Sequence, residues 1–400
     1  MSEFEFDVCV IGGCGHVGLP LALCLADAGL RVAIDDINEE SIATVKSGRM
    51  PFREPGAGEL LQKVLAAGRL EVANDRSLIS RAEHVIVVIG TPVDDHLNPT
   101  YYLIRRLFQS LIPYFRPGQC IILRSTVYPG TTDKVQELMR TAGIDVHVAF
   151  CPERIAEGHA LEELRSLPQV VSGCDARALE MASALFGRMA RTVLPVAPLE
   201  AELTKMFANS WRYIQFAAAN QFLMIAADYG LDFYRIYDVL TRDYPRMSGL
   251  PRAGFSAGPC LFKDTMQLSA ANNNNFYLGH ASMLVNEGLP NFIIKHLKEQ
   301  HDLSSMSVGI LGMAYKAESD DPRQSLSYKL RKVLEYEAAQ VLCTDEYIED
   351  DRFIGAEELV ERAQIIILGA PHRRYRSLRI PADKKVIDIW NFFGNGAELS

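Results

Sequence analysis

The chain of 400 residues is long enough for two or three domains, each with its own core. Apolar residues make up 48% of it and charged residues 23%, as in ordinary globular proteins. Acidic residues outnumber basic ones, 50 against 41, so the net charge is -9. This balance does not favour nucleic acid or an anionic membrane as a partner, because both reward a basic surface.

The N-terminus and the cysteines indicate a reduced, cytoplasmic protein. Met1–Asp7 is acidic and runs straight into a predicted strand, so no signal peptide is expected. The apolar stretch Ile214–Ala227 is too short to span a bilayer and contains polar residues. None of the eight cysteines forms a C-x-x-C pair, so no metal site or thioredoxin-like motif is expected. Scattered thiols in a large acidic chain are typical of the cytoplasm.

A dinucleotide-binding fingerprint occupies the start of the chain. The predicted strand Phe6–Ile11 runs into Gly13-Cys-Gly15-His-Val-Gly18, and a predicted helix, Leu19–Ala28, follows. A second strand, Arg31–Ile34, leads to an acidic residue, for which Asp36 is favoured by spacing over its neighbour. In this order the glycines permit a tight turn and bring the backbone close to a pyrophosphate at the helix N-terminus. A carboxylate that binds both ribose hydroxyls repels a 2′-phosphate, so NAD is favoured over NADP.

The alternation of strands and helices continues, and polar residues follow the next strands. Thr91 comes after His84–Ile89, and Thr126 comes after Cys120–Leu123. In a parallel sheet ligands collect beyond the carboxyl ends of the strands, so both threonines face the expected cofactor crevice, although ordinary turn chemistry also explains them. The strand 146–150 leads to Glu153, Arg154 and Glu157, a set suited to acid/base work or to a plain surface loop.

The longest helical pattern, Leu199–Tyr229, places Lys205 and Asn209 on one face. Its other faces are apolar and rich in alanine, as in a helix packed on several sides. Such a helix extends about 45 Å and could join two lobes and offer a subunit interface. From periodicity alone a solvated polar stripe is the better explanation of the lysine and the asparagine.

The stretch 254–264 carries the most distinctive chemistry of the chain. Small residues surround Cys260, and Lys263 and Asp264 follow it. Small neighbours let a substrate approach the sulfur, and a nearby ammonium favours the nucleophilic thiolate. A buried structural cysteine is the alternative, because free cysteine is among the most buried residue types.

A second α/β run ends the chain, with predicted strands at 307–311, 340–344, 365–369 and 386–389. The turn after its first strand lacks the three-glycine fingerprint, so a second dinucleotide site is not expected. Lys316 and Arg323 would instead suit phosphate, and inert surface charge is the alternative. The predicted fold is α/β: two Rossmann-like parallel-sheet domains, 1–198 and 304–400, joined by a long central helix and a helical domain, 199–303.

Several segments together resemble the UDP-glucose/GDP-mannose dehydrogenase family of nucleotide-sugar 6-dehydrogenases. They keep the family order and cover nearly the whole chain: Gly13–Pro20 with Asp36, Gly48–Pro55, Ser125–Val127, Pro152–Gly158, Glu202–Asn209, Gly258–Asp264, Asn286-Glu287 and Lys316–Ser325. The resemblance implies an N-terminal NAD domain, a central domain that builds a homodimer or higher homo-oligomer, and a C-terminal domain that binds a UDP-sugar. It also implies a four-electron oxidation of the sugar C6 alcohol to a uronic acid, with two NAD+ per sugar, as in polysaccharide biosynthesis.

The same resemblance assigns roles to single residues. Cys260 would trap the aldehyde as a thiohemiacetal, and the thioester formed by the second oxidation would be hydrolysed with Glu153 as base. The implied catalytic set is Cys260, Lys205, Asn209, Asp264, Glu153 and Thr126. The implied cofactor set is Gly13, Gly15, His16, Val17, Gly18, Asp36, Thr91, Thr126, Glu157 and Arg323. The implied substrate set is Glu153, Arg154, Lys205, Asn209, Arg252, Phe255, Gly258, Cys260, Lys263 and Lys316.

Two departures leave the substrate open. Cys151-Pro-Glu-Arg154 differs from the Asn-Pro-Glu-Phe pattern of the glucose enzymes and is similar to branches that act on N-acetylated hexosamines. Gly258-Pro-Cys260 replaces their Gly-Gly-x-Cys. The base is expected to be uracil, but no residue excludes GDP. A two-electron hydroxy-acid dehydrogenase and a catalytically silent nucleotide-sugar-binding protein are the competing interpretations, and the number of NADH formed per sugar separates all three.

Overall fold

The structure, a computed structural model, describes residues 4–90, 101–255, 258 and 260–399, and it divides into two compact units, Met1–Ala208 and Asn209–Ser400. Each unit contains a parallel sheet, so the predicted α/β class with two such sheets is confirmed. The three-domain division stays a prediction, because the helices after residue 209 group with the second sheet. Among the helices of the described ranges, none has the length and apolar content that crossing a membrane requires.

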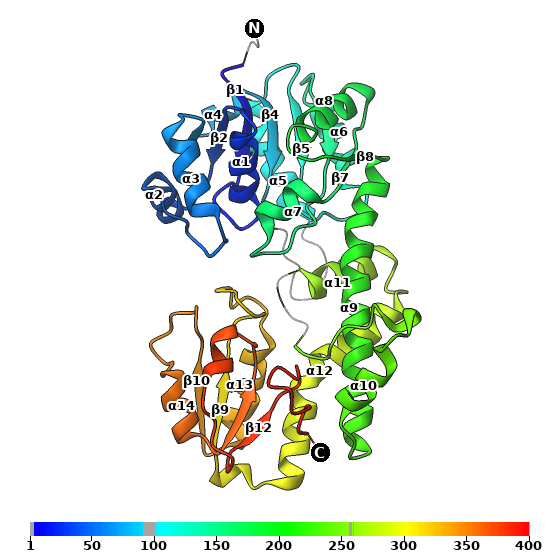
Figure 1. The fold of residues 1–400 in the computed structure, drawn as a ribbon. Helices are drawn as coiled ribbons and strands as arrows, with labels where there is room; N and C mark the ends of the chain where they lie inside the picture. Colours follow the sequence, from blue (N-terminus) through cyan, green and yellow to red (C-terminus); the bar gives the residue numbers. More distant parts are fainter. Residues whose placement is uncertain (1–3, 91–100, 256–257, 259, 400) are drawn as a thin grey trace. The chain divides into compact units, whose positions relative to one another are not determined.

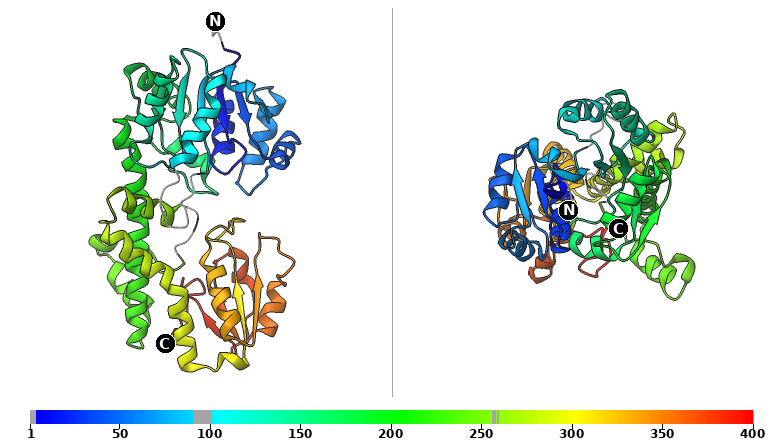
Figure 2. Two further views of the ribbon diagram at one scale, coloured as in Figure 1. Left: turned by 180° about the vertical axis from the view of Figure 1, so that it is seen from behind. Right: turned by 90° about the horizontal axis from the view of Figure 1, so that it is seen from above.

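The first unit is built on a six-stranded sheet in the order β3-β2-β1-β4-β5-β6, and all of its pairs are parallel. Its elements are β1 (Phe6–Ile11), α1 (Gly18–Asp27), β2 (Val32–Asp35), α2 (Glu39–Lys46), α3 (Ala57–Ala66), β3 (Leu70–Ala73), α4 (Ser77–Ser80), β4 (Ala82–Val87), α5 (Tyr101–Leu111), β5 (Cys120–Leu123), α6 (Thr131–Thr141), β6 (His147–Phe150), α7 (Ala160–Ser166) and α8 (Ala176–Phe186). The strands are apolar on both faces because helices cover both faces (Figures 1 and 2). One core contains residues of α1, α3 and α7, and the other contains residues of α4, α5 and α6.

Two short strands of the first unit form a sheet of their own. β7 (Gln169–Val171) pairs in parallel with β8 (Val193–Pro195), and each has three residues.

The helix α9 (Pro198–Asp228) matches the long helix predicted from the sequence and begins at a proline, which favours a first helical position (Figure 1). Glu202 in its first turns is 1% exposed and accepts hydrogen bonds from the backbone of Gly130 and Thr132 at the start of α6. Burial raises the pKa of Glu202, while these hydrogen bonds lower it. The carboxylate thus satisfies free N–H groups of a neighbouring helix and fixes α9 on the first unit.

The second unit has a four-stranded parallel sheet in the order β10-β9-β11-β12. Its elements are α10 (Phe233–Thr241), α11 (Leu261–Ala271), α12 (Tyr277–Gln300), β9 (Ser307–Leu311), α13 (Leu326–Glu337), β10 (Gln340–Thr344), α14 (Ala356–Arg362), β11 (Ile365–Leu368) and β12 (Lys385–Ile387). The described residues also contain short 3-10 helices, at Ile112–Tyr114 in the first unit and at Pro245–Met247, Leu303–Ser305 and Arg373–Ser377 in the second. The core between the sheet and α13 continues to α12 and to the C-terminal half of α9, whereas α14 covers the opposite face.

Candidate active site

The glycine turn after β1 leaves room for a ligand at one position. A Cβ at Gly13 would lie 2.8 Å from Ile34, and one at Gly18 would lie 2.7 Å from Gly13, so both glycines are required by packing. A Cβ at Gly15 would meet no atom within 4 Å. Gly15 is exposed just before the N-terminus of α1, where free N–H groups favour an anion. This arrangement fits the pyrophosphate of NAD.

Asp36 faces this turn, and its neighbour does not. The carboxylate of Asp36 accepts hydrogen bonds from the backbone N–H of Cys14 at 2.8 Å and of Asn38 at 3.0 Å, and the residue is half-buried. Asp35 is 1% exposed, and its carboxylate lies 3.4 Å from the guanidinium of Arg76. Burial raises the pKa of Asp35, and Arg76 opposes that shift. The geometry therefore favours Asp36 over Asp35 as the ribose ligand.

The segment before α3 contacts two parts of the predicted cofactor site, the glycine turn and the loop that carries Glu157. The ring of His16, from the glycine turn, stacks on Phe52 with 4.0 Å between centroids. Glu54 is buried and accepts hydrogen bonds from the backbone of Gly158 and Ala160, each at 2.8 Å. Glu54 therefore fixes the loop that carries Glu157. In the sequence, Glu54 was marked only by its membership of the segment Gly48–Pro55.

Glu153 lies in a buried ion pair that the sequence did not reveal. Arg124, 1% exposed, donates to Oε2 of Glu153 through Nε at 3.0 Å and through Nη2. The backbone N–H groups of Arg154 and Ile155 donate to Oε1 at 2.7 and 3.1 Å. The guanidinium of Arg124 also lies over the ring of Phe186, 4.7 Å from its centroid. Both carboxylate oxygens of Glu153 are therefore occupied by donors.

Cys260 differs from the other cysteines in its exposure. All eight cysteines lie in the described ranges and are free thiols; Cys260 is exposed, Cys174 is half-buried and the rest are buried. Burial raises the pKa of Cys151 and Cys174 to about 12, and that of Cys24 and Cys343 to about 11. Cys260 precedes α11 directly, at a helix end that favours negative charge.

Polar residues of two helices meet beside this cysteine. Asp264, in the first turn of α11, is 0% exposed and accepts a hydrogen bond from the amide of Asn209 on α9 at 2.6 Å. The ammonium of Lys263 lies 3.4 Å from the same carboxylate. Lys205 is half-buried and lies one turn before Asn209 along α9. The structure thus brings together three of the predicted site residues, Asn209, Lys263 and Asp264.

The base of the loop that carries Cys260 is held by a buried asparagine. Asn220 of α9 donates to the carbonyl of Gly254 at 3.0 Å and accepts from its N–H at 2.9 Å. Asn286 of α12 supports it by accepting a hydrogen bond from the same amide at 2.9 Å. A Cβ at Gly254 would lie 2.2 Å from the ring of Trp390. Asn220 and Trp390 therefore fix where this loop begins.

The loop also contacts the turn that follows β9. Gly258 has φ +103°, and a Cβ there would lie 2.6 Å from the ring of Tyr315. Lys316 places its ammonium 5.5 Å from the centroid of that ring. The predicted phosphate ligand Lys316 and the loop of Cys260 are therefore neighbours within the second unit.

The remaining predicted residues have these positions. Arg252 donates to the carbonyls of Trp390 and Asn391 and lies over the ring of Tyr234, and Arg323 forms a bidentate ion pair with Asp321. Phe255 is buried in the core of the second unit, and Val17 is the N-cap residue of α1. Thr126 and Glu157 are half-buried beyond β5 and β6, and Thr91 lies outside the described residues. Their individual roles stay predictions.

Three family models match the chain in order. The NAD-binding domain of the UDP-glucose/GDP-mannose dehydrogenase family matches residues 6–190, its central domain matches 199–287 and its UDP-binding domain matches 309–395. Together they span both units described above.

Curated relatives and solved structures that cover nearly the whole chain are similar to it and belong to the same class of enzyme. The UDP-N-acetyl-D-mannosamine dehydrogenase of Pyrococcus horikoshii is 28% identical over 378 residues, covering 92% of this chain and 90% of the relative. A solved structure of a UDP-D-ManNAc dehydrogenase from Pyrococcus horikoshii has a TM-score of 0.86 at 27% identity, covering 93% of this chain and 91% of the other. A UDP-glucose dehydrogenase from Pyrobaculum islandicum has a TM-score of 0.88 at 25% identity, with coverages of 97% and 95%.

Proposed function

Because the chain belongs to the UDP-glucose/GDP-mannose dehydrogenase family, it is an NAD-dependent UDP-sugar dehydrogenase, and we propose that it oxidises the sugar C6 alcohol to a carboxylate through Cys260. One observation carries the proposal. The cysteine that the sequence motif marks is the exposed one of the eight, and it lies beside Lys263 and the Asn209–Asp264 pair. A structural cysteine would be buried, as its seven counterparts are wholly or partly.

Each residue of the proposed site has a separate role in the oxidation. Bound NAD+ supplies the hydride acceptor, held by Gly15 and Asp36. The thiolate of Cys260 adds to the aldehyde carbon, and its adduct is oxidised to a thioester that water hydrolyses. Lys205 and Asn209, on a rigid helix, donate to the oxygen on which negative charge develops. Overall one alcohol and one water give one carboxylate, while two NAD+ are reduced and three protons are released.

Glu153 is the proposed base for hydrolysis, and its surroundings restrict how it can act. A carboxylate offers about four lone-pair sites, and Glu153 accepts four hydrogen bonds, from Arg124, Arg154 and Ile155. Taking a proton would require one of these donors to withdraw. We therefore infer that Arg124 controls when Glu153 is available. Arg124→Lys tests this, because a lysine keeps the charge but loses the two-nitrogen contact.

We favour a UDP-N-acetylhexosamine over UDP-glucose as the substrate. The segment Cys151–Arg154 is similar to enzymes that act on N-acetylated hexosamines, and a relative from Pyrococcus horikoshii carries the name of such an enzyme. In this proposal Lys316 contacts the diphosphate. A panel of UDP- and GDP-sugars assayed for NAD+ reduction tests the choice, and faster turnover of UDP-glucose would reverse it.

The stoichiometry of the reaction tests the oxidation itself. Two NADH per UDP-sugar support the four-electron reaction, one indicates a two-electron dehydrogenase, and none indicates a binding protein.

Replacement of Cys260 tests the nucleophile. Cys260→Ala should abolish formation of the acid and leave NAD binding intact, because the cofactor residues Gly15 and Asp36 are unchanged. Cys174→Ala, at a half-buried thiol of the first unit, is the matched control and should keep full activity. Unchanged acid production by Cys260→Ala would exclude the thioester route.

We also propose that the chain forms a homodimer through α9. This helix exposes large apolar side chains along its length, among them Phe207 (56%), Trp211 (60%), Phe222 (43%) and Ile225 (45%). Such side chains along one helix are typical of a subunit interface. A second copy of this chain can cover them with the same surface, which closes the assembly. Light scattering should give twice the chain mass, and Trp211→Glu should shift the protein towards the monomer.

A further inference from the structure

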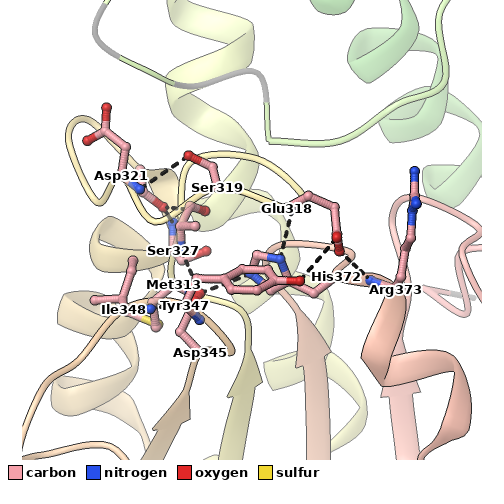
Figure 3. A network of polar contacts seen from close by, with 12 residues as sticks. Met313, Glu318, Ser319, Asp321, Ser327, Asp345, Tyr347, Ile348, His372 and Arg373 are labelled. Carbon is pink, nitrogen blue, oxygen red and sulfur yellow. Dashed lines mark hydrogen bonds and ion pairs between the residues drawn. The ribbon is translucent and has the colours of Figure 1, made fainter. Parts of the chain in front are cut away.

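A buried histidine links three loops at the carboxyl edge of the second sheet (Figure 3). The side chains of His372, after β11, and Asp345, after β10, are both 0% exposed. Nε2 of His372 lies 3.1 Å from Oδ2 of Asp345, and Nδ1 accepts a hydrogen bond from the backbone N–H of Glu318 at 2.9 Å. Since Nδ1 accepts, the ring proton is on Nε2 and is donated to Asp345. Tyr347 and Tyr375 pack edge-on against the ring.

Asp345 fixes the backbone on both sides of this histidine. Its Oδ2 also accepts from the N–H groups of Met313 at 2.6 Å and Ala314 at 2.8 Å, directly after β9. Its Oδ1 accepts from Tyr347 and Ile348 at 2.8 and 3.1 Å. Burial alone would raise the pKa of Asp345, but these donors and His372 together lower it. The carboxylate therefore stays charged and keeps all of its donors.

Glu318 ends the segment in a conformation that needs support. Its φ is +58°, in the left-handed region that a residue with a side chain rarely adopts. Its N–H is held by His372, one carboxylate oxygen accepts from the hydroxyl of Tyr347 at 3.0 Å, and the other accepts from the N–H of Arg373 at 2.8 Å. The strained backbone at Glu318 thus depends on the loops after β10 and β11.

The segment held at both ends, residues 313–318, carries two groups that belong to the proposed site. Tyr315 packs against Gly258 in the loop of Cys260, and Lys316 lies over the ring of Tyr315. Asp345 holds the segment at Met313 and Ala314, and His372 holds it at Glu318. A shift of this segment would therefore move both Lys316 and Tyr315.

We propose that His372 is a positioning residue for the substrate nucleotide: paired with Asp345, it fixes residues 313–318 so that Lys316 is presented to the diphosphate and Tyr315 supports the loop of Cys260. This inference rests on the UDP-sugar site proposed above, but it concerns how tightly the nucleotide binds and not the oxidation. A purely structural histidine would affect the free energy of unfolding and leave the affinity of the folded protein for UDP unchanged.

Two substitutions separate the two hydrogen bonds of His372. His372→Gln keeps a donor that can reach Asp345 and removes the acceptor for Glu318. His372→Asn keeps an acceptor near Nδ1 and removes the donor to Asp345. The Kd for UDP, measured by titration calorimetry on the full chain, should rise about tenfold in both. KM for the UDP-sugar should rise in parallel, whereas the Kd for NAD should stay within about twofold.

A histidine–aspartate pair in the first unit supplies the control. Nδ1 of His147 lies 3.1 Å from Asp175, so His147→Gln removes a partly exposed histidine–aspartate contact outside the second unit and should leave the Kd for UDP unchanged. If the His372 variants do not fold, Tyr347→Phe removes only a hydroxyl that supports Glu318 and should raise the Kd about threefold.

Wild-type affinity for UDP in a folded His372 variant, or in Tyr347→Phe, would overturn the proposal. UDP binding needs no turnover, so this result is independent of the NADH stoichiometry. Failure of the wild-type protein to bind UDP would contradict the proposed nucleotide site. The role of Cys260 would still be tested separately, by acid formation in Cys260→Ala.

Discussion

The turns that follow the first strand of each sheet begin alike and then diverge. Gly12 after β1 and Gly312 after β9 both have positive φ, +73° and +93°, and a Cβ at either would meet a backbone oxygen, at 2.1 Å from Val88 and 2.4 Å from Ala370. Each donates its N–H to the last residue of the neighbouring second strand. In both turns an aspartate just after that second strand accepts hydrogen bonds from the turn: Asp36 accepts from the N–H of Cys14, and Asp345 accepts from those of Met313 and Ala314.

The two aspartates then serve different ends. Asp36 is half-buried, and the turn that it faces opens at Gly15, where a Cβ would meet nothing. Asp345 is fully buried and takes His372 as an additional partner. The aspartate at this position is therefore half-buried in the first sheet, where we propose that it holds a ligand, and is fully buried among protein partners in the second.

The largest effect on the free energy of unfolding should come from removing Asp345, the buried aspartate. Asp345→Leu leaves His372 and four backbone N–H groups without their acceptor, so the second unit should lose about 3–5 kcal/mol of its free energy of unfolding. Both tryptophans, Trp211 and Trp390, lie in that unit, so their fluorescence during urea unfolding measures it. Asp36→Leu is the matched change, followed by far-UV circular dichroism because Met1–Ala208 contains no tryptophan, and a shift of similar size there would break the comparison.

The paired glycines should separate stability from cofactor binding. Gly312→Ala places a Cβ against the backbone of Ala370 at a left-handed φ and should cost about 2–4 kcal/mol in urea unfolding. Gly15→Ala should unfold as the wild type does, because its Cβ enters open space, yet it should weaken NAD binding. Full NAD affinity in Gly15→Ala would show that the open position does not hold the pyrophosphate.

Removing the aspartate that faces the open turn should act on the cofactor. Asp36→Ala should raise the Kd for NAD by about 10–100-fold, because charge-assisted hydrogen bonds to the ribose hydroxyls are lost. NADP should be discriminated against less strongly, since the repulsion of its 2′-phosphate disappears. Fluorescence titration with both cofactors measures this. An unchanged NAD affinity would contradict the proposal that Asp36 binds the ribose hydroxyls.

The smallest effect should come from making the first turn more like the second, by Cys14→Ala, because Ala314 donates in the second turn as Cys14 does in the first. NAD affinity should change less than about twofold, since the donor is a backbone N–H.

Burial and Asp36 raise the pKa of Cys14 to about 12. Above about pH 9 the unfolded chain loses this proton and the folded chain keeps it, so wild-type stability falls as pH rises. The variant should lack about 1 kcal/mol of that fall at pH 10, and parallel pH profiles would contradict it.

Local patterns predicted most of the fold. The strands β1, β5, β9 and β10 and the helix α9 were placed to within a residue at each end, because apolar runs and their flanking glycines and prolines are adjacent in the chain. The edge strand β3 was missed because its exposed Glu71 interrupts the continuous apolar run that marks the fully buried strands.

The candidate site was predictable where its residues are close in sequence. The glycine turn and the Lys263-Asp264 pair could be found from spacing alone. The supporting residues could not, because their partners are distant: 29 residues separate Arg124 from Glu153, 34 separate Asn220 from Gly254, and 27 separate Asp345 from His372. Side chains that hold others in place carry no local pattern, and only the folded chain identifies them.

The unequal exposure of the cysteines has a consequence for how the protein can be damaged or inhibited. Peroxides and electrophilic drugs react with accessible thiolates, and burial keeps the thiols of Cys9, Cys14 and Cys120 protonated and shielded. If Cys260 is the nucleophile, as proposed, oxidative stress would inactivate the molecule at this exposed sulfur before it disturbs the core. A covalent inhibitor built on a UDP scaffold would meet one fully exposed thiol, with Cys174 half-buried and the other six buried.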